Sequence, residues 1–353
     1  MSANQNNRGG VKFIFLVGFL SAVVLGAVTK DAIMSFVNTT NGQKLQQIIT
    51  EAKDAVPVAS LPLTPEVKLQ GEETGRVNVL ILGIGGEDHP GSLLTDTIML
   101  ASFDTVNIKA DIFSIPRDLA VSVPGRGTIT KINALYEFSG SAVFPNPGGV
   151  DLIQQKVQEI TGIKAQYYFI ADFDALTQVI DDVGGISIPQ EDSLKDKTFP
   201  TDDRGFETFA VQRGWRYLNG QDALKYVRTR HTGNGDFDRM RRQHTVLLAL
   251  KQKIQGLNSV KDLPTIIKIY QHAQSHIASN ASIGEIQRVW NITKGFSQGN
   301  VEFHVISSEP DNLLVSKIAN WDGQQAYTLQ PKAGLEDYSQ IQQFIQQILS
   351  PTT

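Results

Sequence analysis

Residues 77–82 read VNVLIL, a nearly continuous run of apolar side chains. A strand with one wet face would alternate apolar and polar residues, so this run predicts a strand that is covered on both faces. Further strands are predicted at residues 97–103, 110–115, 167–171, 186–188 and 301–306. The run at 77–82 is the first of them and marks the start of the folded domain, near Arg76.

Helices are expected between and after these strands. In residues 151–161, Leu152, Val157 and Ile160 have the spacing of one buried helical face. Similar patterns predict helices at residues 173–183, 263–273, 283–292 and 338–349. Strands that alternate with helices indicate an α/β fold, with a central sheet flanked by helices on both sides.

The highest local concentration of positive charge lies at residues 226–243, which read YVRTRHTGNGDFDRMRRQ. The segment is expected to form a helix that ends near Arg228, a glycine-containing loop, and a second helix capped by Asp236 or Asp238. One guanidinium group can donate two parallel hydrogen bonds to two phosphate oxygens. The N–H groups of a helix's first turn also attract anions. Arg228, Arg230 and Arg239 are therefore predicted to converge on one phosphate or pyrophosphate. The alternative is a solvated, charged helix face, to which Arg241 and Arg242 would also belong.

Residues at strand ends are the next candidates, because ligands of α/β sheets bind there. The turn at residues 83–86, GIGG, lacks the lysine of a nucleotide-binding P-loop. Asp96 directly precedes an apolar strand and is either a turn residue or a metal ligand. Pro116 stops the third strand and directs Arg117 off its end. Lys131 follows another glycine-containing turn and supplies one more cation.

Composition excludes several classes of function. The chain has 353 residues, enough for one large domain or two small ones, and its formal net charge of −4 argues against a protein that coats nucleic acid. It has no cysteine, which excludes disulfides, thiolate metal sites and a cysteine nucleophile. Its six histidines form no zinc motif, and no G-x-S-x-G elbow is present.

The N-terminal residues predict membrane attachment. Arg8 and Lys12 precede the uncharged run at residues 13–29, whose 17 residues would span about 25 Å as a helix. Lysines at both ends can extend towards the membrane surface and make up the difference from a hydrocarbon core of roughly 30 Å. A cleaved signal peptide is the alternative, but the usual cleavage triplet is poorly matched. The expected order is a cytoplasmic tail (1–10), a single-pass anchor (11–30), an extracytoplasmic stalk (31–75) and a folded domain (76–353).

Six motifs in order give the chain a specific resemblance. They are TDTIML (95–100), SIPRD (114–118), KINALY (131–136), DFDAL…DDVGGI (172–186), LNGQDALKYVRTR (218–230) and GDFDRMRRQ (235–243). Together they resemble the LytR–CpsA–Psr family of cell-envelope phosphotransferases. The resemblance covers a core of about residues 76–250, followed by a C-terminal extension, and a single membrane span before an external domain is also typical of the family.

The resemblance implies a transfer reaction outside the cell membrane. Family members move a glycopolymer from a polyprenyl-pyrophosphate lipid onto peptidoglycan, through a new phosphodiester bond. The residues implied to bind the pyrophosphate and carry catalysis are Arg117, Arg228, Arg230 and Arg239, with Lys131 and Gln243 contributing to binding. Asp96 is implied to bind Mg²⁺ or to orient the attacking hydroxyl. The expected partners are the lipid-linked glycopolymer, peptidoglycan and the membrane, with no nucleic acid.

Two positions depart from the family pattern. This chain has Gly85 where many members have an acid, and Leu94 where many have an arginine. The metal donors are then either Asp96 with Glu87 or Asp88 from the neighbouring loop, or Asp96 alone with the phosphates. Two other functions stay open: a polyprenyl-pyrophosphate binding protein or pyrophosphatase, and a non-enzymatic regulator of the transcriptional-attenuator type.

Overall fold

The computed structural model describes residues 67–86, 91–138, 140, 144–201, 205–229, 236–257, 265, 268–269, 272, 275–293, 300–308, 311–321 and 324–350. These residues form two compact units. The sheet unit comprises Gln70–Phe173, Ala278–Asn280 and Phe296–Thr353, and the arginine unit is built mainly from Asp174–Ile277 and Ala281–Gly295. The predicted anchor lies outside the described residues, and no helix inside them has the length and apolar character that a membrane crossing requires.

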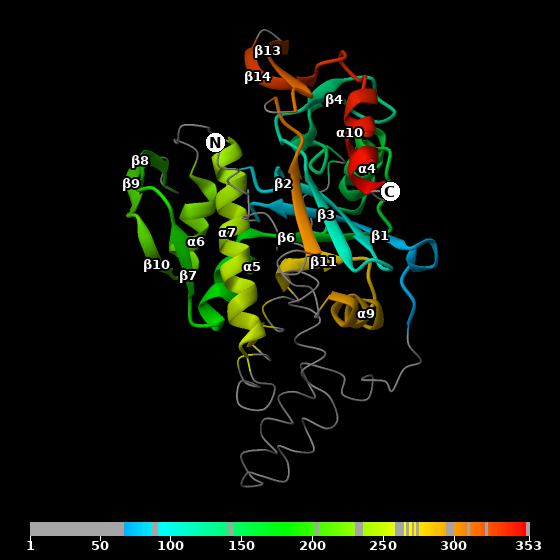
Figure 1. Cartoon of the computed structure of the whole chain (residues 1–353). Coiled ribbons are helices and arrows are strands. Elements are labelled where there is room, and N and C mark those ends of the chain that lie inside the picture. Colours follow the sequence, from blue (N-terminus) through cyan, green and yellow to red (C-terminus); the bar gives the residue numbers. More distant parts are fainter. Residues whose placement is uncertain are drawn as a thin grey trace, which may run out of the picture. The chain divides into compact units, whose positions relative to one another are not determined.

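The sheet unit contains a six-stranded mixed sheet with strand order β11-β6-β1-β2-β3-β12 (Figure 1). Its strands are β1 (Arg76–Ile84), β2 (Thr95–Asp104), β3 (Lys109–Ser114), β6 (Tyr167–Ala171), β11 (Ile277–Ser279) and β12 (Val301–Val305). The neighbours β1–β2 and β2–β3 are antiparallel, whereas β1–β6 and β3–β12 are parallel. Apart from β11, each of these strands matches a strand that the sequence predicts.

The central strand β1 is buried on both of its faces, as the apolar run predicts. Leu80 and Leu82 on one face are 0% and 1% exposed, and Val79 and Ile81 on the other are 2% and 1% exposed. The face of Leu80 and Leu82 packs in one cluster with side chains of α4 (Pro147–Thr161) and α10 (Ser339–Leu349). These two helices lie side by side in Figure 1. The fold is therefore mixed α/β, with a central mixed sheet flanked by helices.

Helix α4 begins at a tightly packed corner of the sheet unit. The Asn146 side chain caps the helix by accepting a hydrogen bond of 3.1 Å from the Gly149 N–H. Its amide also donates to the main-chain oxygen of Tyr136 at 2.6 Å. A Cβ atom on Gly149 would lie 1.9 Å from that same oxygen, so only glycine fits there.

The arginine unit combines helices with two antiparallel strand pairs. Its elements are α5 (Phe173–Asp182), β7 (Ile186–Gln190), β8 (Leu194–Pro200), β9 (Phe206–Val211), β10 (Gly214–Leu218), α6 (Gly220–Arg228), α7 (Asp236–Gln255) and α9 (Ile283–Thr293). Strand β7 pairs with β10, and β8 pairs with β9. Asn219 caps α6 by accepting from the Asp222 N–H at 2.8 Å.

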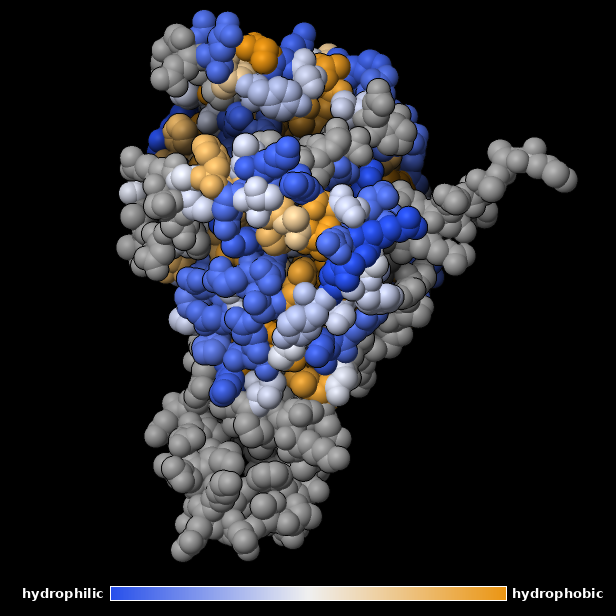
Figure 2. All heavy atoms as spheres, turned by 90° about the vertical axis from the view of Figure 1, so that its left-hand side faces the viewer, coloured by the Kyte–Doolittle hydropathy of each residue, from blue (hydrophilic) through white to orange (hydrophobic). Residues whose placement is uncertain are grey.

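On the face in Figure 2, hydrophilic residues cover most of the coloured surface, with smaller hydrophobic areas among them.

Several strands were not expected from the sequence. They are β7's partner β10, the pair β8–β9, the short pair β4 (Ala120–Ser122) and β5 (Ile129–Lys131), and the pair β13 (Leu314–Trp321) and β14 (Gln324–Pro331). Strand β8, for example, reads LKDKTFP and buries only Leu194, Asp196 and Phe199. Such mixed sequences lack the apolar run that identifies a strand of the central sheet. Of the helix expected at 263–273, residues 265, 268, 269 and 272 are described, and all are helical.

Candidate functional site

The predicted site residues fall into three groups in the structure. Asp96, Arg117 and Lys131 belong to the sheet unit, whereas Arg228, Arg239 and Gln243 belong to the arginine unit. Arg230 and Asp88 lie outside the described residues. The convergence of all these side chains on one diphosphate therefore stays a prediction.

In the sheet unit, four side chains of alternating charge form one ionic group. The Nη1 atom of Arg117 donates to Oδ1 of Asp96, and its Nε lies 3.7 Å from Oδ2 of Asp118. The Nζ atom of Lys131 donates to Oδ1 of Asp118 at 2.5 Å. The structure thus brings together the three predicted residues of this unit, and Asp118 joins them.

Main-chain hydrogen bonds hold the segments that carry this ionic group. The Asn133 N–H donates to the main-chain oxygen of Arg117 at 3.3 Å, and the Thr95 hydroxyl donates to that of Asn133 at 3.2 Å. The Leu119 N–H closes a turn onto Pro116 O at 3.1 Å. The start of β2, the turn after β3 and the end of β5 are therefore fixed against one another.

The bounds of β2 correct one expectation from the sequence. Asp96 does not precede the strand: β2 begins at Thr95, so Asp96 is its second residue. The guanidinium of Arg117 is engaged by Asp96 and faces Asp118, and its expected contact with a ligand stays a prediction. Two carboxylates and two cations sum to a formal charge of zero. These four side chains by themselves do not create an excess of positive charge for an anion.

Asp118 is the residue of this group that the sequence reasoning missed. The sequence feature that could have identified Asp118 is its position directly beside Arg117 in the SIPRD motif. The side chains of Arg117 and Asp118 are 14% and 15% exposed, and those of Asp96 and Lys131 are 25% and 27% exposed. All four side chains are therefore partly reachable from solvent, as ligand-binding groups must be.

In the arginine unit, the arginines of residues 226–243 differ in their exposure and in their contacts. Arg241 is exposed and pairs with Asp238 of the same helix at 3.4 Å, so the reading of a solvated face holds for it. Arg239 is buried, at 2% exposure, and lies in the first turn of α7 as predicted. Arg228, at the end of α6, has its guanidinium carbon 5.7 Å from the ring centroid of Phe199, within cation–π range.

Arg242 connects the two helices of this segment. Its Nε donates to the main-chain oxygen of Tyr226 at 3.0 Å, and its Nη2 donates to that of Thr229. The Tyr226 hydroxyl donates a hydrogen bond to Oε1 of Gln190 at 2.5 Å. Burial raises the pKa of this hydroxyl to about 12, so it stays protonated and can donate. The end of α6, where Arg228 lies, is thereby held from two sides.

Two further residues of α7, Gln243 and His244, are also buried. Gln243 is 9% exposed, which agrees with its predicted place on the face of Arg239, four residues earlier. His244 is 5% exposed, and burial lowers its pKa to about 4. His244 is therefore neutral at physiological pH.

Asp96 is the described residue that could hold a magnesium ion at this site. In the part of the chain that the structure describes, Asp96 belongs to no preformed group of three metal-binding side chains. Glu87 and Asp88, the other expected donors, lie outside the described residues. Mg²⁺ is commonly held by one or two carboxylates together with phosphate oxygens and waters, so a single partly exposed aspartate fits the ion.

Comparison with known proteins places the chain in a family. The LytR_cpsA_psr family model matches residues 33–336. The chain is 30% identical over 197 residues to the "Regulatory protein MsrR" of Staphylococcus aureus strain COL, covering 55% of this chain and 54% of MsrR. It is 28% identical over 267 residues to the "Polyisoprenyl-teichoic acid--peptidoglycan teichoic acid transferase TagV" of Bacillus subtilis, covering 74% of this chain and 64% of TagV. The chain thus spans between half and two thirds of the length of these relatives.

Solved structures show the same fold. The crystal structure of B. subtilis TagV aligns with a TM-score of 0.57 at 26% identity, over 79% of this chain and 98% of that chain. A structure of TagT bound to LIIa-WTA aligns with a TM-score of 0.57 at 23% identity, over 80% of this chain and 94% of that one. The family match covers most of the sequence and includes every motif described above. The chain belongs to the LytR_cpsA_psr family.

Proposed function

We propose that this protein is a membrane-anchored, extracytoplasmic phosphotransferase. It moves a glycopolymer from a polyprenyl-pyrophosphate lipid onto peptidoglycan and leaves a phosphodiester bond. Membership of the family supports this proposal, together with the similarity to TagV, which is named as a teichoic acid transferase to peptidoglycan. In this proposal, residues 1–10 form the cytoplasmic tail, residues 11–30 form the membrane anchor and residues 31–75 form the stalk.

The observation that carries the proposal is the burial of Arg239 in the first turn of α7. Its exposure is 2%, and it lies at the helix end that favours negative charge. Taking a guanidinium out of water is costly, and contact with a bound anion offsets the cost. Arg228, ordered against Phe199, lies at the end of the preceding helix. An anionic group bound here would be a phosphate of the lipid carrier.

In the proposed reaction, the acceptor hydroxyl of peptidoglycan attacks the phosphorus that carries the glycopolymer. The new phosphorus–oxygen bond forms as the bond to the bridging oxygen breaks, polyprenyl phosphate leaves with the electron pair, and the proton of the hydroxyl passes to solvent. Charge builds on the bridging and terminal oxygens, and fixed guanidinium groups stabilise it. Arg117, Arg228, Arg230 and Arg239 have that role, while Lys131 and Gln243 contribute to binding.

Asp96 has the metal-binding or hydroxyl-orienting role in this proposal. When bound, Mg²⁺ would supply positive charge to the phosphate oxygens. The ionic group of Asp96, Arg117, Asp118 and Lys131 has no net formal charge, so attraction of a diphosphate to this unit needs additional positive charge. A divalent cation held by Asp96 is one source of it.

The direct test is a transfer assay with the full-length protein, a labelled lipid-linked donor and peptidoglycan. We expect a labelled peptidoglycan conjugate, and we expect Arg228→Ala to lose at least about 100-fold in rate. Arg241→Ala is the matched control, because Arg241 is exposed on the same segment and should retain activity. Arg239→Lys tests the buried position without deleting its charge. Full activity of both Arg228→Ala and Arg239→Lys, with native circular dichroism, would overturn the assignment.

The same assay separates the two alternative functions. A pyrophosphatase would release phosphate without forming a conjugate, and a binding protein would form neither product. The name of MsrR, a regulatory protein, is the observation that favours a regulator. A gel-shift with DNA at physiological salt tests direct DNA binding, which the net charge of −4 disfavours.

A further inference from the structure

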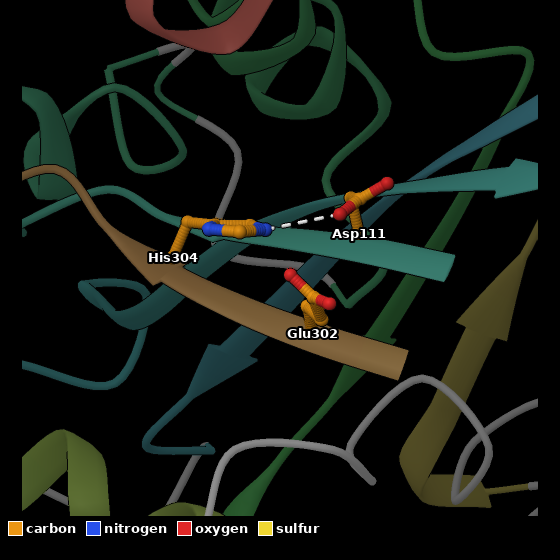
Figure 3. Close-up of side chains that lie close together, drawn as sticks. All are labelled: Asp111, Glu302 and His304. Carbon is orange, nitrogen blue, oxygen red and sulfur yellow. Dashed lines mark hydrogen bonds and ion pairs between the residues drawn. The ribbon is translucent and has the colours of Figure 1, made fainter. Parts of the chain in front are cut away.

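Three metal-binding side chains lie together on the sheet unit, apart from the ionic group of Asp96. Asp111 is on β3, and Glu302 and His304 are on β12, the strand at the edge of the sheet. One ligand atom of each residue lies within 4.8 Å of those of the other two. Figure 3 shows the imidazole and both carboxylates directed towards one another.

The pairing of the two strands brings these residues together. Strands β3 and β12 are parallel, and Glu302 is the register partner of Asp111. Residues two apart on a strand project from the same face, so His304 lies on the same side as Glu302. Asp111 and His304 are separated by 193 positions in the sequence. No local motif connects them, so the site is not recognisable from the spacing of the histidines.

The His304 ring is held in a fixed orientation. It stacks on Phe113, with ring centroids 5.1 Å apart, and meets the ring of Phe344 from α10 edge-on at 6.4 Å. Its Nε2 atom lies 3.0 Å from Oδ1 of Asp111, so this nitrogen faces the carboxylates. The aromatic neighbours therefore restrain the imidazole before any ion arrives, which reduces the entropic cost of binding.

The charge and the donor types of the group suit a metal ion. Two carboxylates this close repel each other unless a cation compensates them. Imidazole nitrogen and carboxylate oxygen are both ligands that Zn²⁺ accepts, and three protein ligands leave a fourth position for water. Bonds of about 2.0–2.1 Å in tetrahedral geometry place ligand atoms about 3.3 Å apart. The His304–Asp111 separation of 3.0 Å is close to that value, and all three ligand atoms lie within 4.8 Å of one another.

We propose that Asp111, Glu302 and His304 bind a divalent transition-metal ion, with Zn²⁺ as the best match. Hard cations such as Mg²⁺ and Ca²⁺ prefer all-oxygen sites and should bind here poorly. The ion would link β3 to the edge strand β12 and so fasten the C-terminal part of the chain to the sheet. This site does not depend on the proposed transferase activity.

The alternative is that His304 and Asp111 form a plain ion pair, with Glu302 an exposed neighbour. Glu302→Gln distinguishes the two, because it removes one metal donor and leaves the pair of His304 and Asp111 intact. His272→Asn is the matched control. His272 bonds Asp182 at 2.6 Å, but within the described part of the chain that pair has no third metal-binding side chain.

The experiment measures Zn²⁺ binding to the full-length, chelator-treated protein by calorimetry, and its Tm with and without Zn²⁺. Excess Mg²⁺ is present throughout to occupy hard-cation sites. We expect one ion per chain and a rise in Tm with Zn²⁺ in the unmodified protein. Glu302→Gln and His304→Asn should weaken binding at least about tenfold and remove the Tm rise, while His272→Asn should change neither. Absence of binding, or equal Zn²⁺ affinity in the unmodified protein and Glu302→Gln, would overturn the proposal.

Discussion

The guanidinium of Arg242 in α7 donates from Nε to the main-chain oxygen of Tyr226 in α6, at 3.0 Å. A second hydrogen bond, from Nη2, reaches the main-chain oxygen of Thr229. The last carbonyls of a helix lack partners within it and carry partial negative charge, so a buried arginine is well suited to this position. Arg242 therefore fixes the end of α6, where Arg228 lies, and acts as a structural arginine inside a segment that otherwise indicates an anion site.

This relationship predicts a large difference between adjacent arginines. Arg242→Gln should lower the free energy of unfolding by about 2–3 kcal/mol, because it removes charged donors from buried carbonyl groups. Arg241→Gln should change it by less than about 0.5 kcal/mol, because Arg241 is exposed. Urea unfolding of both variants, followed by circular dichroism, is the measurement. Equal stability of the two variants would contradict the structural role of Arg242.

The start of α4 predicts a steric effect. Gly149→Ala would place Cβ 1.9 Å from the main-chain oxygen of Tyr136, so the helix must move away from its corner. We expect a loss of at least about 2 kcal/mol in the free energy of unfolding. Gly148→Ala is the control: Gly148 is exposed in the same helical turn, and alanine there should be neutral or stabilising. Thermal unfolding of both variants measures the effect, and a stable Gly149→Ala protein would disprove the close approach.

Glu336 predicts a dependence of stability on acid. Burial alone would raise its pKa, but hydrogen bonds from Ser122, Tyr338 and Lys156 outweigh it and lower the pKa to about 2. A carboxylate with a depressed folded-state pKa contributes stability above its unfolded pKa of 4.5, and loses that contribution as pH falls towards about 2. Unfolding midpoints in urea between pH 7 and pH 2 should therefore fall more steeply in the unmodified protein than in Glu336→Gln. Parallel curves would show that Glu336 is not the group responsible.

The proposed role of Asp96 predicts a change in metal dependence. Asp96→Asn removes a carboxylate donor, so transfer should slow by about 100-fold and respond less to added Mg²⁺. The control is Asp104→Asn, at the opposite end of β2, where Asp104 accepts hydrogen bonds from the N–H groups of Val106 and Asn107. Conjugate formation is measured over a range of Mg²⁺ concentrations, with chelator as the zero point. An unchanged Mg²⁺ response in Asp96→Asn would remove this residue from the metal site.

The proposed anchor predicts the location of the full chain. The full-length protein should sediment with membranes, and deletion of residues 1–30 should release it, because the apolar run at 13–29 is the only strongly apolar stretch of that length near the N-terminus. Fractionation with immunoblotting measures both forms. A full-length protein that stays in the supernatant would rule out the anchor.

The sequence by itself determined the main strands, most of the helices and the family. The strands of the central sheet are recognisable because their burial requires apolar residues, as in Leu80 and Leu82 of β1. The place of Arg239 in the first turn of α7 also follows from local pattern, since helical spacing is a property of neighbouring residues. The expected cap by Asp236 or Asp238 is wrong, because the helix begins at Asp236 and includes both residues. The family was recognisable from the ordered motifs, because each motif has specific residues at fixed spacing.

Only the tertiary structure decided which charged groups meet. Nothing in the spacing of Asp96, Arg117, Asp118 and Lys131 shows that they form a neutral ionic group, and nothing near Arg242 shows that it binds the carbonyls of α6. Asp111 and His304 meet only because β3 and β12 pair in parallel across 193 positions. Long-range pairing depends on the packing of the whole sheet, whereas a local sequence pattern records only what each segment buries.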